Sequence, residues 1–150
     1  MPINVELVGK SYPSQTYEVN REKIREFADA IGDPNPAYRD REHAQALGHR
    51  DVVAPPTFGI VVTRGPQIAV IDDPDLGLDF SRVVHGDQQF TYERAVVSGD
   101  VLTTTATIDS ARTMAGNDIV TIRSDVVDAE GAAVLSAWAT LVARAAEAGS

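Results

Sequence analysis

The loop over residues 32–38 holds the side chains of this chain that are best suited to chemistry. Its carboxylate, Asp33, and its carboxamide, Asn35, each precede a proline. Proline fixes its own φ and pushes the preceding residue into an extended conformation, so both side chains should be held still. A carboxylate held in this way can act as a general base, and the amide can orient it or a water molecule. A plain turn between two helices uses the same residue types, so the loop alone leaves both interpretations open.

Two helices should position this loop. Over residues 21–31 the apolar side chains recur with helical spacing, and Asn20 is a suitable N-cap for that helix. After the loop, a second and shorter helix is predicted from Asp40, as its cap, to Leu47. A short strand is predicted over residues 15–19. The candidate acid therefore follows the end of an amphipathic helix.

A nearly all-apolar helix is predicted over residues 58–71, and a helix without a polar face is buried. Thr57 is a possible N-cap, and Pro66 should kink or restart the helix. The free amides at the helix start suit an oxyanion, because the helix dipole is positive there. The apolar residues after them could line a tunnel, although ordinary core packing is their more common role. The candidates for substrate contact are Thr57, Phe58, Gly59, Ile60 and Val61.

The second half of the chain predicts four antiparallel strands, because β-branched residues alternate there and the connections are short. The strands are expected over residues 88–97, 101–109, 119–127 and 133–143, joined in order as a meander. Helices followed by strands indicate the α+β class, with the sheet packed on the buried helix. The chain should form one domain, 1–150, with a disordered tail from about residue 144.

Composition excludes several classes of function. The formal charge of −9 argues against nucleic acid and anionic membrane surfaces as partners. No apolar run approaches the ~18 residues of a membrane span, and no signal-peptide pattern begins the chain, so a cytoplasmic protein is expected. Cysteine is absent and the three histidines have no metal-ligand spacing, so no metal site is expected.

The motif Gly32-Asp33-x-Asn35-Pro36 resembles the signature of the MaoC-like family, the (R)-specific enoyl-thioester hydratases and 3-hydroxyacyl-thioester dehydratases. A second similarity lies in residues 83–90, followed by the Gly-Asp-x-Leu type of turn at 98–102. The resemblance implies a single hot-dog fold, in which a curved antiparallel sheet wraps around a central helix. It implies no metal or organic cofactor. Because one hot-dog unit leaves a sheet edge open, a second hot-dog subunit, like or unlike, is the expected partner.

In that family the signature continues to a histidine that forms the catalytic pair with the aspartate, and here that position holds Tyr38. An unperturbed tyrosine has a pKa of about 10, against about 6.5 for histidine, so Tyr38 would be a poor base at neutral pH. Either His85, the only histidine within a stretch of family likeness, supplies the missing group, or a partner subunit with an intact motif does. Heterodimeric dehydratases of fatty-acid elongation, in which one subunit has a degenerate motif, are the implied model.

The resemblance therefore implies a subunit of a dehydratase or hydratase in fatty-acid metabolism, acting on an acyl-CoA or acyl-carrier-protein thioester. Its catalytic candidates are Asp33, Asn35, Tyr38 and His85. A non-catalytic acyl-thioester-binding module is the alternative that the lost histidine suggests. A thioesterase is less favoured, because residues 57–71 contain no Asp or Glu to face a scissile carbonyl.

Overall fold

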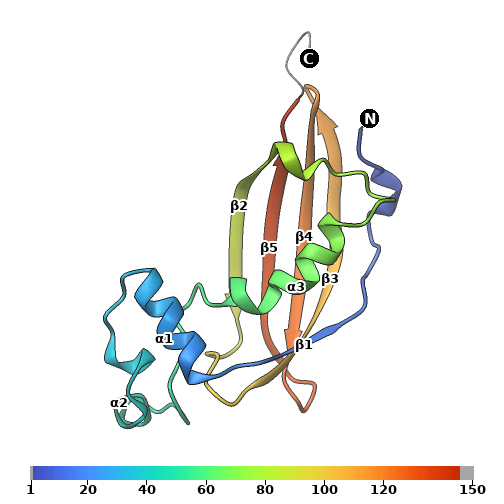
Figure 1. The fold of residues 1–150 in the computed structure, drawn as a ribbon. Coiled ribbons are helices and arrows are strands. Elements are labelled where there is room, and N and C mark those ends of the chain that lie inside the picture. Colours follow the sequence, from blue (N-terminus) through green and yellow to red (C-terminus); the bar gives the residue numbers. More distant parts are fainter. Residues whose placement is uncertain (1, 146–150) are drawn as a thin grey trace.

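One antiparallel sheet of five strands curves around a long helix in the computed structural model, which describes residues 2–145 (Figure 1). The helix and the sheet form two packed layers, and α1 and α2 lie beyond one end of the sheet (Figure 1). This arrangement confirms the predicted α+β hot-dog fold. The strands are β1 (Gln15–Glu18), β2 (Val83–Tyr92), β3 (Val101–Met114), β4 (Asn117–Val127) and β5 (Ala133–Ala143). The helices are α1 (Arg21–Ala30), α2 (Arg41–Ala46) and α3 (Gly59–Ile71), with 3-10 turns η1 (Val5–Leu7), η2 (Pro36–Tyr38) and η3 (Phe80–Arg82).

The strand order β1-β3-β4-β5-β2 corrects the predicted four-strand meander. Strands β3, β4 and β5 do follow one another as hairpins, but β2 pairs with β5 and not with β3. The predicted strand over residues 88–97 ends at Tyr92. Its apolar continuation, Val96 and Val97, is buried and carries the chain across the core, where Val97 bridges to Val53. An apolar run shows that a segment is buried, and does not show which strand it lies beside.

The two helices around the candidate loop form as predicted. The Asn20 side chain accepts a hydrogen bond from the Lys23 amide at 2.9 Å, and α1 ends just before Gly32, whose φ of +70° favours glycine. Asp40 caps α2 by accepting from the Glu42 amide at 2.9 Å. The amides of Arg144 and Ala145 are both hydrogen-bonded, so these two residues are not part of a disordered tail. The rest of the predicted tail, residues 146–150, lies outside the described part of the chain.

Helix α3 differs from the prediction at both its start and its surface. Phe58 is the N-cap and no side chain bonds the first amides, so Thr57 is not the cap. The helix continues through Pro66, which is buried. Ile60 and Ile68 are 37% and 38% exposed, so α3 is not buried on all sides. The sheet covers one side of the helix, and apolar residues of α3 near β2 stay partly uncovered.

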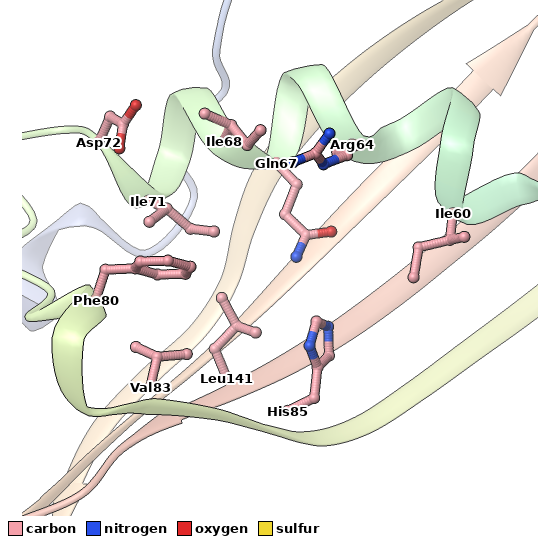
Figure 2. A pocket seen from close by; sticks show the side chains of 10 residues that line it. All are labelled: Ile60, Arg64, Gln67, Ile68, Ile71, Asp72, Phe80, Val83, His85 and Leu141. Carbon is pink, nitrogen blue, oxygen red and sulfur yellow. The ribbon is translucent and has the colours of Figure 1, made fainter.

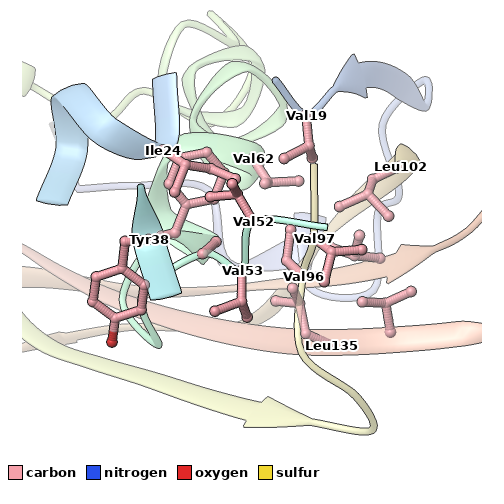
Figure 3. Packing of buried hydrophobic residues seen from close by; sticks show 14 of the residues in the cluster. Val19, Ile24, Tyr38, Val52, Val53, Val62, Val96, Val97, Leu102 and Leu135 are labelled. Atoms are coloured by element: carbon pink, nitrogen blue, oxygen red, sulfur yellow. The ribbon is translucent and has the colours of Figure 1, made fainter. Parts of the chain in front are cut away.

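A hydrophobic cluster joins the two outer helices to α3 and to the adjacent end of the sheet (Figure 3). Phe58 is fully buried in it and meets the ring of Phe27 edge to face at 5.5 Å between centroids. This cluster holds the candidate loop close to the start of α3. Its members labelled in Figure 3 are Val19, Ile24, Tyr38, Val52, Val53, Val62, Val96, Val97, Leu102 and Leu135.

Asp100 secures the connection from β2 to β3. Its buried carboxylate accepts hydrogen bonds at 2.9 Å from Arg94, from Arg50 and from the Val97 amide. Burial alone would raise the pKa of Asp100, but the bonds from Arg94, the Val97 amide and Arg50 outweigh that effect and hold the pKa below its usual value. Because Arg50 follows α2, this carboxylate also ties the outer helices to the sheet.

Asp100→Asn should lower the free energy of unfolding by about 2 kcal/mol at pH 7, less than a fully buried pair would lose, because both guanidiniums reach solvent. A lowered folded-state pKa stabilises the protein above the unfolded-state value of about 3.9, and this stabilisation is lost as pH falls through the folded-state value. The difference in free energy of unfolding between Asp100→Asn and wild type should therefore become smaller at acidic pH. Urea denaturation at pH 7 and below pH 4 measures it. Asp109→Asn, which breaks an exposed pair with Arg123, is the control and should cost less than about 0.5 kcal/mol. Equal stability of Asp100→Asn and wild type at pH 7 would contradict this expectation.

Candidate functional site

The loop over residues 32–38 is braced by its own side chains. The carboxylate of Asp33 accepts a hydrogen bond from the Asn35 amide at 3.1 Å, and the Asn35 side chain accepts one from the Ala37 amide at 3.0 Å. The turn interpretation is thus correct for the local geometry, since each side chain caps the next step of the chain. It leaves room for chemistry, because a carboxylate has about four acceptor sites and Asp33 uses one of them for the loop.

Arg39 holds this loop from the outside, and sequence reasoning missed it. Its guanidinium donates to the backbone carbonyl of Asp33 at 2.7 Å and to that of Asn35 at 3.0 Å. It also donates to the Asp29 carboxylate on α1 at 2.6 Å. The loop is therefore tied to α1 on both sides of Pro34. One feature of the sequence indicates this role. A basic residue directly follows a proline-rich loop, and the backbone carbonyls of such a loop are not bonded within a helix or a sheet.

Tyr38 lies at the edge of the hydrophobic cluster, with 8% of its surface exposed. Its hydroxyl points away from the labelled core residues (Figure 3). Burial raises the pKa of Tyr38, the charge of Asp33 raises it further, and a bond with Asn35 opposes both. The structure thus brings Asp33, Asn35 and Tyr38 together, and Tyr38 stays protonated at neutral pH.

The start of α3 is closely packed against β2. A methyl group added at Gly59 would lie 2.9 Å from the Phe90 ring and 3.1 Å from the Tyr92 hydroxyl, so only glycine fits there without a shift. The Tyr92 hydroxyl donates to the carbonyl of Pro56. Burial raises the pKa of Tyr92, and the Gly59 amide counteracts this by bonding to the phenol oxygen. The amide predicted to hold an oxyanion is therefore directed at the Tyr92 oxygen in this structure.

The other substrate-contact candidates have separate locations. Thr57 is exposed, Phe58 belongs to the core, and Val61 packs against the hydrophobic cluster. Ile60 alone of the five lines a cavity of about 410 Å³ between α3 and β2 (Figure 2). The lining residues are Ile60, Arg64, Gln67, Ile68, Ile71, Asp72, Phe80, Val83, His85 and Leu141.

His85 lies in this cavity and not at the candidate loop. It pairs with Leu141 on β5, whereas Tyr92, at the end of β2 nearest the start of α3, pairs with Leu135. Seven residues of strand span about 23 Å, so the structure does not bring His85 to the end of β2 that adjoins Gly59. The catalytic pairing of Asp33 with either His85 or Tyr38 stays a prediction.

Within residues 2–145 no three histidine or acidic side chains lie close enough together to share a metal ion. None of the helices in the same part of the chain has the length and apolarity needed to cross a membrane.

A second cavity, of about 490 Å³, contains the ion pairs of Asp100 described above, together with Asp128 and Glu130.

A curved antiparallel sheet around one helix, with a braced Asp-x-Asn-Pro loop after the first outer helix, defines a hot-dog protein of the MaoC-like type. Residues 6–137 match the family model described as FAS1-like, dehydratase domain region, and the chain belongs to that family. A UPF0336 protein of Streptomyces coelicolor is 60% identical over 148 residues, which cover 98% of this chain and 99% of that protein.

Two solved structures are similar in both sequence and fold. One is the C-terminally truncated HadBC (3R)-hydroxyacyl-ACP dehydratase complex of Mycobacterium tuberculosis, with 33% identity, a TM-score of 0.81 and coverage of 91% of this chain and 96% of that chain. The other is a MaoC-like dehydratase with 31% identity and a TM-score of 0.86, covering 93% of this chain and 43% of that chain. These similarities confirm the resemblance to MaoC-like proteins.

Proposed function

We propose that the chain is a subunit of an (R)-3-hydroxyacyl-thioester dehydratase or enoyl-thioester hydratase, working beside a hot-dog subunit that carries the missing histidine. The observation that carries this proposal is the braced Asp33 next to a buried, protonated Tyr38. The family membership supports it. The dehydratase named in the HadBC complex supports it as well.

The reaction needs an acid–base pair. In the dehydration direction a base removes the proton from the α-carbon, and that electron pair forms the double bond. The hydroxyl on the β-carbon leaves and takes a proton from the acid, so that water is released. We assign Asp33 to one role and the partner's histidine to the other. Negative charge develops on the thioester oxygen. We propose that this oxygen accepts a hydrogen bond from the Gly59 amide and takes the place that the Tyr92 hydroxyl has there.

The cavity between α3 and β2 is the proposed acyl site. Ile60 places one end of the cavity next to the start of α3, where the thioester would lie. Five of its nine other lining residues are apolar and can contact an acyl chain, namely Ile68, Ile71, Phe80, Val83 and Leu141. Mixing the purified chain, alone and with its genomic neighbour, with crotonyl and longer enoyl thioesters tests the activity. Loss of the enoyl absorbance is the readout.

The open edge of β2 is the proposed partner surface. Within the described residues β2 pairs with β5 alone, so its outer edge presents unpaired backbone groups. Apolar side chains are exposed beside that edge. They are Ile60 at 37%, Ile68 at 38%, Val84 at 46% and Phe80 at 63%. A second hot-dog subunit would cover both the edge and this patch, as the two-subunit HadBC complex suggests.

Ile68→Glu should weaken assembly with the partner, or with a second copy, by about a hundredfold, because a buried unpaired charge costs several kcal/mol. Sedimentation of the mixture measures the change. Met114→Glu is the matched control, since Met114 ends β3, which β4 and β5 separate from β2, and is 50% exposed, and it should leave assembly unchanged. Equal effects of the two substitutions would place the interface elsewhere.

A non-catalytic acyl-thioester-binding module is the second candidate, and the tyrosine at position 38 favours it. Binding of long-chain thioesters without turnover in any pairing would establish that function in place of catalysis. A thioesterase remains the third candidate. Release of free thiol from an acyl-CoA would identify it.

A further inference from the structure

Two polar side chains face each other across the cavity between α3 and β2 (Figure 2). Gln67 extends from the helix toward the sheet, and His85 extends from the strand toward the helix. Ile60 lies on one side of this pair, toward the start of α3. The most apolar part of the cavity lies on the other side, and its walls are Ile71, Phe80, Val83 and Leu141 (Figure 2).

Neither polar group has a role in the fold. Within residues 2–145 the structure gives neither the Gln67 carboxamide nor the His85 imidazole a hydrogen-bond partner. Gln67 is half-buried and His85 is exposed, so both groups are accessible to water. An acyl chain that filled the cavity would displace this water. A purely apolar chain would then leave two polar groups without partners, which costs free energy.

We propose that Gln67 and His85 select acyl thioesters whose chain carries an oxygen substituent, a hydroxyl or a carbonyl, level with this pair. A carboxamide and an imidazole can each donate and accept, so together they bind both hydrogens and lone pairs of such a group. The inference rests on the proposed function, because it takes the thioester to lie at the start of α3. Gln67 follows Gly59 by eight residues, or about 12 Å of helix, which is comparable with an extended octanoyl chain.

The test compares octanoyl-CoA with its ω-hydroxy derivative by isothermal titration calorimetry. Both are saturated, so neither turns over during the measurement. Wild-type protein in its native oligomeric state should bind the hydroxylated ligand about tenfold more tightly. Gln67→Leu and His85→Leu should each abolish or reverse this preference. Gln89→Leu, on the opposite face of β2, and His43→Leu, on α2, are the matched controls and should keep it.

The ratio of the two affinities within one variant cancels any loss of folded protein. Octanoyl-CoA binding as tightly as its hydroxy derivative, with the same ratio in every variant, would overturn the inference and leave the proposed function standing. Failure of wild-type protein to bind either ligand would overturn the inference, and the enoyl-thioester assay described above would decide the proposed function separately.

Discussion

Replacing Tyr38 with histidine should raise the enoyl-thioester hydratase activity of the isolated chain by about a hundredfold to ten-thousandfold, the usual contribution of a positioned general acid or base. Tyr38 stays protonated at neutral pH because the ordinary pKa of tyrosine is about 10, and burial and the charge of Asp33 raise the pKa of Tyr38 further. A histidine there would restore a group that exchanges its proton near neutral pH. Hydration of crotonyl-CoA, followed across pH 5 to 9, measures the gain and should show a new limb in the pH profile.

Tyr38→Phe is the control for that experiment. If a partner supplies the proton carrier, loss of the hydroxyl should change the activity of the complex by less than about twofold. A folded Tyr38→His variant that remained as inactive as the wild-type chain would mean that position 38 is not where the missing group belongs.

Asp33→Asn should lower the activity of the complex with a histidine-bearing partner by about a hundredfold to ten-thousandfold. Asparagine keeps the side-chain oxygen that accepts from the Asn35 amide, so the loop should keep its shape. The substitution therefore removes the charge and basicity of the carboxylate and little else. The steady-state rate with a saturating enoyl thioester is the measurement.

Asp40→Asn is the matched control, because Asp40 caps α2 from the same segment and asparagine is an equally good cap. It should leave the rate within about twofold of wild type. An Asp33→Asn complex with undiminished activity would assign the chemistry wholly to the partner. This chain would then be the non-catalytic acyl-binding module.

The features that local chemistry determines could be predicted from the sequence. The caps at Asn20 and Asp40 are local interactions of single side chains, and both are correct. The alternation in β3, β4 and β5 places Leu102, Val120 and Ile122 in the core, as predicted. Proline spacing predicted a rigid loop, and the structure shows how its side chains brace it.

What could not be predicted depends on residues distant in sequence. Periodicity shows which face of a strand is buried, but not which strand lies beside it, so β2 was placed next to the wrong neighbour. The hydrogen bonds of Asp100 join segments that are distant in sequence, since Arg50 lies fifty residues before Asp100. The location of His85 depends on the pairing of β2 with β5. The side of α3 that stays exposed depends on how the sheet curves around the helix.

The attachment of the outer helices has a consequence for how such proteins diverge. The segment between β1 and α3 meets the rest of the chain at one corner. There the amide of Ser98 bonds Val52, the amide of Ala54 bonds Val96, and Gly99 bonds Val19. None of these three bonds belongs to the strand ladders, so we expect most exchanges within that segment to leave the pairing of the sheet unchanged. After a gene duplication, one copy could thus give up its proton-transfer residue and keep its acyl cavity, dividing the labour between two descendants of one ancestor.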